Sequence, residues 1–442
     1  MNRIAIKPTW LISMISEPLR DHWLVASAGR IEYIGPSLPS SIDTDCCVEL
    51  PNVAILPGLI NTHCHLEFSD LNNPFAVNGS FTQWISEVVS YRRSSNEDPL
   101  INRKRAIQRG IRESYGSGVR YLIDTITAPW SVDWIQEAID ECSAPSDAAK
   151  VLTGNSPFLI QVCPEVLDIR LERREITRNH CRDVNRSIVG RKWSTGRHAI
   201  SPHAPYTTSL QLVRETVQSL KAVDGIVSMH LGESRDEIAW LSDRSGPMLE
   251  ALKNFRDTHY LENIGTLHNY VRAIVEAPIA LVAHGNYLAT DDLESLIANR
   301  QTAAIVHCAR TFKHFHAHES YPLADRLALG ITHLLGTDSR ASNPDLNLWA
   351  EVQAVANSHA IDPEQVIAMV TRFPAELLGL SDLGTLEMGK RSLCSAIGVD
   401  GLTVLTPDQV LNRLVKPDTM AVPLERLLQN RVGGMRNSES GL

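Results

Sequence analysis

The sequence lacks several features that would assign it to common classes of protein. No apolar run approaches the roughly 18 residues that a membrane span needs, and the N-terminal segment lacks the apolar core and cleavage site of a signal peptide. The eight cysteines form no CxxC pair and have no repeated spacing, which favours reduced thiols over a disulfide framework. A net charge of −9 provides no general attraction for nucleic acid or an anionic membrane. We therefore expect a cytoplasmic protein without nucleic-acid or membrane partners.

One basic segment departs from this acidic balance. Residues 170–193 carry eight Lys or Arg side chains against three acidic ones. The acidic residues are interleaved with the basic ones and aromatic residues are nearly absent. The pattern therefore indicates a solvated helical face rather than a surface for nucleic acid.

The order of short apolar segments and longer helical patterns predicts the fold. The chain has 442 residues, of which 43% are hydrophobic, so it can bury a large core. From residue 57 onward the chain contains eight strand-like segments. The first ends at His63, and the others span residues 119–126, 158–166, 198–204, 225–233, 279–287, 302–310 and 332–339. Eight strands alternating with helices predict an α/β fold, a parallel (β/α)8 TIM barrel over residues 57–383. Residues 1–56 and 384–420 contain short β-like runs and are predicted to form one small composite β-sandwich domain from both chain ends.

One amphipathic helix is predicted over residues 81–93. Phe81, Trp84, Ile85, Val88 and Val89 recur at the helical spacing i, i+3, i+4, i+7 and i+8. Trp84 could stack on an aromatic substrate, but a residue at such a spacing more often faces the core.

Histidines occur at the ends of the predicted strands. The stretch LINTHCHLE closes the first strand, and because side chains alternate along a strand, His63 and His65 point the same way. Later strands end in His203, His230, His284, His307 and Asp338, and Glu233 follows His230 by three residues. In a β/α barrel the catalytic groups lie at the C-terminal ends of the strands. A single histidine there is more often structural, but this ordered set indicates a functional site.

These motifs resemble those of a known family. PGLINTHCH, SPHAPYT, HLGES, VAHGN and GTDS are similar to the motifs of the amidohydrolase superfamily, in its cytosine-deaminase-like and chlorohydrolase-like branch. The loops lean toward aminodeoxyfutalosine deaminase-like proteins. The resemblance covers about residues 57–390 and implies one catalytic metal held by His63, His65, His230 and Asp338. It also implies that Glu233 and His284 assist catalysis, that His203 contacts the substrate, and that the protein is a homodimer.

The chemistry of these side chains agrees with that assignment. Three imidazoles and one carboxylate suit zinc, with iron(II) as the alternative, and leave a position for water. The metal would lower the pKa of that water toward about 7 and so provide hydroxide. Asp338 could accept the proton of the water, Glu233 could protonate a ring nitrogen of the substrate, and His284 could orient the hydroxide. The predicted function is hydrolytic deamination of an aminated purine- or pyrimidine-like ring or nucleoside, a small-molecule substrate.

A second metal is the main alternative at the site itself. Two-metal relatives use a carboxylated lysine on strand four or a glutamate on strand three. The fourth strand has no lysine, and Glu165 could serve as the strand-three glutamate, but Glu233 after His230 favours one metal. His314, His316 and His318 could form a separate metal site, although a loop that covers the substrate is favoured.

Other polar residues have simpler interpretations. His307 is interpreted as a strand residue with a satisfied hydrogen bond, and His333 should face away from the metal. Arg310 and Arg340 could bind an anionic group of the substrate or lie at the surface. Cys64 is interpreted as an inert packing residue.

Two other functions remain open at this stage. One is hydrolytic dechlorination or dealkylamination of a triazine-like ring. The other is a catalytically silent barrel that acts as a binding or scaffold protein, which would not require metal-ligand residues at its strand ends.

Overall fold

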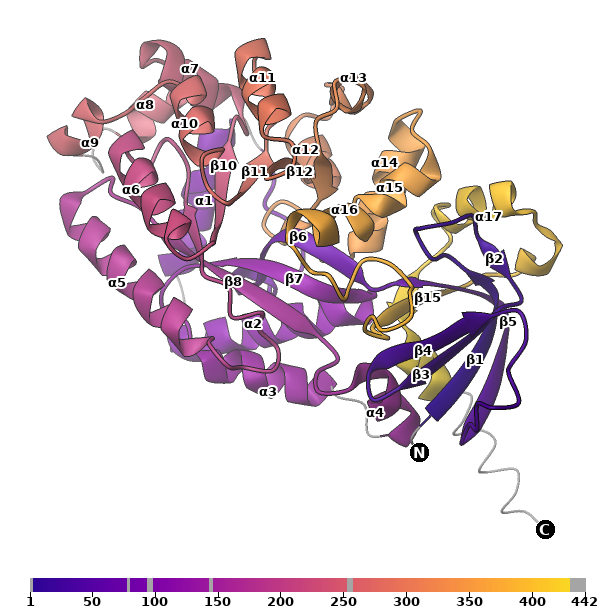
Figure 1. Cartoon of the computed structure of the whole chain (residues 1–442). Coiled ribbons are helices and arrows are strands. Elements are labelled where there is room, and N and C mark those ends of the chain that lie inside the picture. Colours follow the sequence, from indigo (N-terminus) through magenta and orange to yellow (C-terminus); the bar gives the residue numbers. More distant parts are fainter. Residues whose placement is uncertain (1–2, 78–79, 94–97, 143–145, 253–256, 430–442) are drawn as a thin grey trace.

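The computed structural model describes residues 3–77, 80–93, 98–142, 146–252 and 257–429. They form a β/α barrel with a separate sheet at one side (Figure 1), and the N-terminal strands and the C-terminal segments lie together in that sheet region. The fold predicted from the sequence is confirmed: an α/β barrel and a small β domain built from both chain ends.

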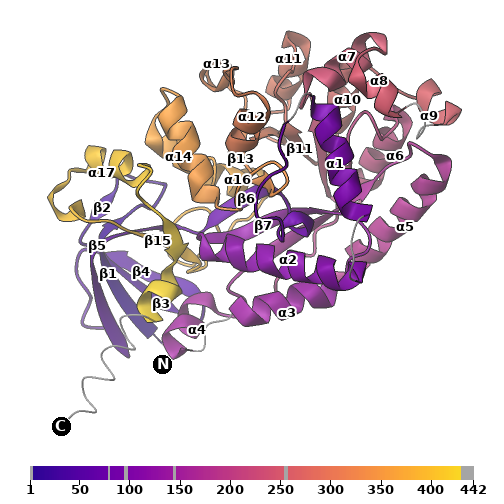
Figure 2. The ribbon, with the colours of Figure 1, turned by 180° about the vertical axis from the view of Figure 1, so that it is seen from behind.

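The small domain contains one seven-stranded sheet. Its main path runs β16-β15-β5-β1-β3-β4, and β2 pairs with β1. The strands are β1 (Arg3–Leu11), β2 (Leu19–Arg20), β3 (Trp23–Ser27), β4 (Arg30–Gly35), β5 (Cys46–Pro57), β15 (Cys394–Gly398) and β16 (Ala421–Pro423). Helix α4 (Asp147–Thr153) packs Val151 and Leu152 into the core beneath this sheet. Figure 2 shows the same sheet from behind, with α4 at its edge.

The large domain is a closed parallel barrel. Its strands are β6 (Leu59–His65), β7 (Val119–Ile126), β8 (Leu159–Val166), β9 (Ala199–Pro202), β10 (Ile226–Leu231), β11 (Ile279–His284), β12 (Ala303–His307), β13 (His333–Leu335) and β14 (Asp338–Ser339). β13 pairs with β12 and β14 pairs with β6, and only two residues separate β13 from β14 along the chain. The eighth predicted strand is thus split in two, and its halves close the barrel.

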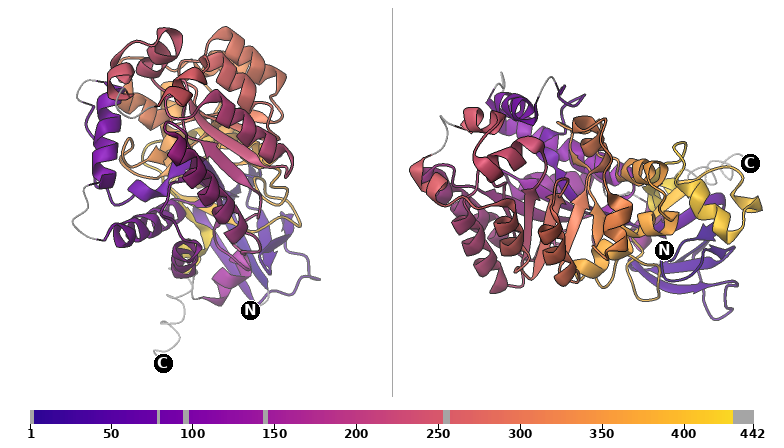
Figure 3. Two further views of the ribbon diagram at one scale, coloured as in Figure 1. Left: turned by 90° about the vertical axis from the view of Figure 1, so that its left-hand side faces the viewer. Right: turned by 90° about the horizontal axis from the view of Figure 1, so that it is seen from above.

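The other helices lie around the barrel (Figure 3), except α17, which lies beside β2 of the small domain (Figure 1). They are α1 (Phe81–Arg93), α2 (Pro99–Gly116), α3 (Val132–Cys142), α5 (Leu171–Ser187), α6 (Leu210–Lys221), α7 (Arg235–Asp243), α8 (Pro247–Leu252), α9 (Thr258–Glu262), α10 (Leu267–Ile274), α11 (Thr290–Ala298), α12 (Ala309–Phe315), α13 (Leu323–Ala328), α14 (Leu348–Ser358), α15 (Pro363–Ala368), α16 (Arg372–Leu377) and α17 (Pro407–Leu414). Most of α5 faces outward and only three of its residues are buried, which confirms the solvated helical face predicted for this basic segment. In the described part of the chain, every helix is too short or too polar to cross a lipid bilayer.

The predicted helix at residues 81–93 is α1, and its aromatic residues form a cluster above the barrel. Trp84 is half-buried; its ring lies 5.6 Å from that of Phe81 and 5.0 Å from that of Phe315. Its indole Nε1 donates to the carbonyl of Ala341 at 3.0 Å. Trp84 is therefore a packing residue of this cluster, as its spacing in the sequence predicts.

The barrel and the small domain are joined by a tight crossing and a buried ion pair. β5 continues into β6 through Gly58, where an added Cβ would lie 2.5 Å from the carbonyl oxygen of Leu393, so the crossing requires glycine. Arg120 of β7 and Glu425 of the C-terminal segment are both buried, and Arg120 Nη1 donates to Glu425 Oε1 at 2.8 Å. The Arg120 guanidinium also donates to the carbonyl of Cys394. A charge pair with this many hydrogen bonds can be buried because neither partner loses its polar contacts.

Candidate active site

Three histidines from two strands meet at the C-terminal end of the barrel. His63 and His65 lie on β6, and His230 lies on β10. The ring centroid of His63 is 4.9 Å from that of His65 and 4.9 Å from that of His230. The Nε2 atoms of His65 and His230 are 3.2 Å apart. His63 and His65 thus lie on the same side of β6, as the alternation of side chains along a strand predicts. The fifth strand of the barrel, β10, supplies the third imidazole.

Asp338 and His284 complete this group. Asp338 Oδ1 lies 3.7 Å from Nε2 of His63 and 3.7 Å from Nε2 of His65. The ring of His284 is 5.6 Å from that of His63. His284 has φ +68° and Asp338 has φ +55°, a left-handed conformation that is uncommon for residues other than glycine. Such backbone conformations concentrate at functional sites, where the surrounding structure holds them.

The donor atoms of this cluster fit a bound metal. Both ring nitrogens of His63 and Nδ1 of His65 are buried and have no hydrogen-bond partner among the described residues. Burial, and then the neighbouring imidazoles, hold the pKa values of His63 and His65 well below the usual value, so both rings are neutral at pH 7. Neutral imidazole is the form that binds metal, and three imidazoles with one carboxylate suit zinc. A metal would supply the missing partner of Nε2 of His63, the buried nitrogen that lies toward Asp338.

Neighbouring hydrogen bonds orient His230 for the same purpose. Its Nδ1 lies 2.9 Å from the carbonyl oxygen of His203. Since a carbonyl oxygen only accepts, Nδ1 carries the proton and Nε2 is left free to bind. A ligand histidine is commonly fixed in this way by a carbonyl or carboxylate behind it.

The GTDS segment is positioned against the first strand. An added Cβ on Gly336 would lie 2.9 Å from Cβ and from the carbonyl oxygen of His63, so only glycine allows this approach. Asn61 Nδ2 donates to Thr337 Oγ1 at 2.8 Å, which ties strand one to strand eight. Ser342 Oγ donates to Asp338 Oδ2 at 2.6 Å. Burial nevertheless raises the pKa of Asp338 to about 6, which is suitable for a group that must accept and return a proton.

Glu233 lies beside His284 at the edge of the cluster. Its Oε1 is 3.5 Å from Nε2 of His284, and the side chain is buried. Burial, and then the charges of Asp338 and Glu237, raise the pKa of Glu233 well above its usual value. A raised pKa favours the protonated form of Glu233, which is the form that a general acid requires.

The backbone of Glu233 is held from both sides. Glu237 accepts hydrogen bonds from the amides of Gly232 and Glu233, at 3.0 and 2.9 Å. Asn286 Nδ2 donates to the carbonyl of Glu233 at 2.9 Å, and Nε2 of His316 lies 3.3 Å from the same oxygen. The Asn of the HGN motif and the histidine of the loop after strand seven thus hold the backbone that carries Glu233.

His203 and Glu165 form a second group beside His230. One donor atom of each of these three residues lies within 4.8 Å of the others. Glu165 is buried, and its Oε1 has no hydrogen-bond partner in the described part of the chain. Burial raises the pKa of Glu165 to about 7. The structure thus places the strand-three glutamate next to the predicted substrate-contacting histidine.

Two further histidines lie apart from the cluster. His333 contacts the hydroxyl of Tyr321 at 3.2 Å and the carbonyl of Ile331 at 3.1 Å, and does not face the metal ligands, as predicted. His307 stacks on Tyr321 at 3.8 Å. The interpretation of His307 as hydrogen-bonded is wrong for Nδ1, which is buried without a partner among the described residues because the ring is held by stacking.

The HxHxH run in the loop after strand seven does not form a metal cluster in the described structure. Part of it is helical, because α12 extends to Phe315. His314 contacts the carbonyl of Phe75 at 2.9 Å, and His316 lies over the backbone of Glu233. His318 is exposed. The segment therefore covers the site, in agreement with the favoured interpretation.

Both arginines considered for anion binding have internal partners. Arg310 Nε donates to Glu351 Oε1 at 2.6 Å, and its Nη2 donates to Asp345 Oδ1 at 2.7 Å. Arg340 Nη1 donates to Glu113 Oε1 at 2.6 Å. These pairs assign structural roles to both side chains. Cys64 is fully buried in the apolar core, as expected for a packing residue.

The sequence analysis missed a charged group beside the cluster. Glu67 lies two residues after His65, is buried, and forms ion pairs with Arg92 of α1 and Arg103 of α2. Thr127 donates to Glu67 Oε2 at 2.8 Å. A glutamate two residues after the HxH pair is the feature of the sequence that could have indicated this group. Its arginine partners, however, come from helices whose packing the sequence does not specify.

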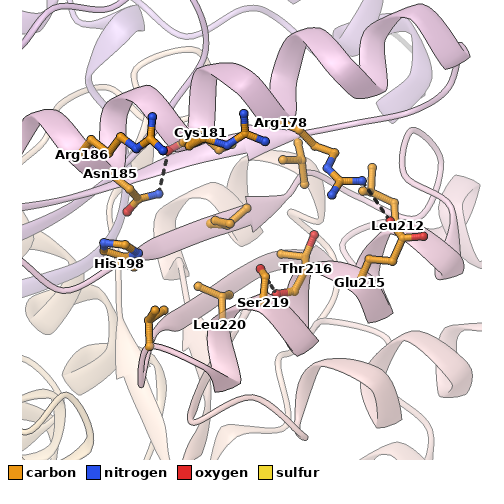
Figure 4. A pocket seen from close by; sticks show the side chains of 14 residues that line it. Arg178, Cys181, Asn185, Arg186, His198, Leu212, Glu215, Thr216, Ser219 and Leu220 are labelled. Carbon is orange, nitrogen blue, oxygen red and sulfur yellow. Dashed lines mark hydrogen bonds and ion pairs between the residues drawn. The ribbon is translucent and has the colours of Figure 1, made fainter.

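A separate pocket of about 380 Å³ lies between α5 and α6, on the outside of the barrel. Figure 4 shows Arg178 and Arg186 of α5 on one side and Glu215 and Ser219 of α6 on the other. Arg178 Nη1 donates to Glu215 Oε2 at 3.2 Å. Its lining residues are all distinct from those of the histidine cluster, so this pocket is not part of the candidate active site.

Comparisons with known proteins show the family of the chain and the folds that it resembles. The model of the Amidohydrolase family matches residues 54–397. A 5-methylthioadenosine/S-adenosylhomocysteine deaminase from Moorella thermoacetica is 24% identical over 429 residues, which cover 94% of this chain and 90% of the relative. The structure of Helicobacter pylori aminofutalosine deaminase with methylthio-coformycin matches with a TM-score of 0.76 and 21% identity, over 95% of this chain and 97% of that one. Atrazine chlorohydrolase from Arthrobacter aurescens with zinc matches with a TM-score of 0.72 and 19% identity, over 97% and 99%.

Proposed function

Since the chain belongs to the amidohydrolase family, we propose that it is a hydrolytic deaminase with one metal held by His63, His65, His230 and Asp338. The observation that carries the proposal is the buried carboxyl group of Glu233, which lies 3.5 Å from His284 at the edge of the histidine cluster. Deamination of a ring needs an acid for the ring nitrogen as well as an activated water. This site contains a group suited to each task.

The metal that these ligands favour is zinc, with iron(II) as the alternative. When bound, such a metal supplies Lewis acidity that makes a water molecule nucleophilic near neutral pH. One metal is favoured because the group formed by Glu165, His203 and His230 would have to share His230 with the first site. The ligand identities can be tested by metal analysis of single variants.

The proposed roles of the protein groups account for every proton in the reaction. Glu233 donates its proton to a ring nitrogen, which makes the adjacent amino-bearing carbon electrophilic. Asp338 takes a proton from the attacking water and passes it to the amino group, which leaves as ammonia when the carbon–nitrogen bond breaks. The remaining hydroxyl proton returns to Glu233 as the ring carbonyl forms. His284 donates or accepts a hydrogen bond at the attacking oxygen and fixes its direction.

The proposed substrate is a small molecule, an aminated purine- or pyrimidine-like ring or nucleoside. Support comes from the deaminases among the relatives, named for methylthioadenosine, adenosylhomocysteine and aminofutalosine. An ammonia-release screen over 5′-methylthioadenosine, S-adenosylhomocysteine, 6-amino-6-deoxyfutalosine, cytosine and guanine tests this directly. Turnover of at least one compound, dependent on metal, is expected. The absence of ammonia from all of them would contradict the proposal.

The second candidate function is hydrolysis of a chlorinated or alkylaminated triazine. It is favoured by the similarity in fold to an atrazine chlorohydrolase. Adding atrazine to the same screen and measuring chloride release distinguishes the two activities. A catalytically silent barrel would hold no stoichiometric metal and release neither product. The cytoplasmic location and the homodimer stay predictions.

A further inference from the structure

Glu165 is a buried carboxyl group that the proposed reaction does not use. It lies at the end of β8, and its side chain is buried although Oε1 has no partner in the described structure. A buried carboxylate oxygen without a hydrogen bond costs free energy, on the order of 1–3 kcal/mol or more. Such a group is retained where a ligand supplies the missing donor.

The group next to Glu165 is also an acceptor. Nδ1 of His203 lies 2.6 Å from Thr207 Oγ1, and that hydroxyl donates to the carbonyl of Ala204 at 3.2 Å. Because the hydroxyl proton of Thr207 is used there, Nδ1 of His203 must be the donor, and its Nε2 is left as an acceptor. Glu165 and His203 thus offer two hydrogen-bond acceptors side by side.

The pair lies on one side of His230 and the catalytic acid lies on the other. Glu165 and His203 follow β8 and β9, whereas Glu233 and His284 follow β10 and β11. A ring whose amino-bearing carbon is near Glu233 and His284 would extend a substituent toward Glu165. The part of the substrate that Glu165 contacts is thus distinct from the reacting amino group.

We propose that Glu165, with His203, binds hydroxyl groups on a sugar-like substituent of the substrate. A hydroxyl group donates to a carboxylate or imidazole, and two neighbouring hydroxyls match two neighbouring acceptors. A carboxylate that accepts from ribose hydroxyls is a frequent solution in nucleotide-binding proteins. The substrate is then a ribonucleoside and not a free base. This inference rests on the proposed deaminase function.

The test compares Glu165→Gln with wild type on four matched compounds: 5′-methylthioadenosine, its 2′-deoxy and 3′-deoxy analogues, and adenine. The wild-type enzyme should have the highest kcat/KM for the ribonucleoside. In Glu165→Gln, kcat/KM for the ribonucleoside should fall about 10- to 100-fold, mainly through KM, as expected for a lost charged hydrogen bond. Activity on the analogue that lacks the bound hydroxyl should change little, and the metal content should be unchanged. Glu172→Gln, an exposed residue of α5, is the control and should behave as wild type.

Several results would overturn the inference while leaving the deaminase function in place. One is ammonia release by the wild type from a free base with equal or higher kcat/KM than from the ribonucleoside. Another is an equal loss on all four compounds in Glu165→Gln. Loss of metal from Glu165→Gln would instead assign Glu165 to a second cation site with His203 and His230. If the wild type releases ammonia from none of the compounds in the wider screen, the proposed function itself fails.

Discussion

Replacing Glu233 by glutamine separates proton transfer from metal binding. Burial and the nearby acidic groups raise the pKa of Glu233, which favours the neutral carboxyl group, and the amide of glutamine has the same shape as that group. We therefore expect the folded structure and the metal content to be retained. The amide cannot donate a proton to the ring nitrogen and take it back. Turnover should fall by about 100- to 10,000-fold, the range for loss of a general acid–base group.

The assay measures kcat for ammonia release and metal per chain in the same preparation. Glu172→Gln, on the exposed face of α5, is the control for the chemical change and should retain both. Asp338→Asn is the contrasting variant, because it replaces the carboxylate that is the proposed metal ligand and proton acceptor and whose Oδ1 lies 3.7 Å from Nε2 of His63 and of His65. It should lose metal and activity together. Wild-type turnover in Glu233→Gln would refute the role of ring protonation, and loss of its metal would show that the roles of Glu233 and Asp338 are reversed.

Three further predictions concern the ligands, the packing around them and the domain contact. His63→Ala should lose metal and activity together while circular dichroism shows a retained fold, because the other ligands cannot restore the coordination geometry; full metal with full turnover would refute the assignment. Gly336→Ala should weaken zinc affinity about 10- to 100-fold in a chelator competition, since the new Cβ would lie 2.9 Å from His63. Gly398→Ala is the control and should leave zinc affinity unchanged, because an added Cβ there has no neighbour within 4 Å. Glu425→Ala should lower the free energy of unfolding in urea by about 3–5 kcal/mol because Arg120 would be left buried and unpaired; a loss below about 1 kcal/mol would contradict a role of this pair in stability.

The positions of the proposed ligands could be predicted from the sequence because two simple rules determine them. Side chains alternate along a strand, which places His63 and His65 on the same side, and parallel barrel strands end at the same face. His230 lies one residue before the end of β10, His284 ends β11 and Asp338 begins β14, so the strand assignment alone brings them near the HxH pair. Their roles as ligands stay a prediction.

The groups that support the site could not be predicted in the same way. Arg92 reaches Glu67 only because α1 packs over the barrel mouth, and no periodicity specifies that packing. Glu237 binds the two amides of the turn after β10 through its side chain, a contact that depends on the exact start of α7. The eighth strand is split at Gly336 and Thr337, and Asp338 directly after the break has a left-handed conformation, which local propensity does not favour.

The most direct test of the central claim is a zinc titration of metal-free protein with ammonia release as the readout. The compound with the highest turnover in the screen is used as substrate, and bound zinc is measured in parallel. We expect no turnover without metal and a linear rise that ends at one zinc per chain, because one set of ligands is proposed from His63, His65, His230 and Asp338. Equal turnover in metal-free protein, or a rise that ends only at two zinc ions per chain, would contradict the account.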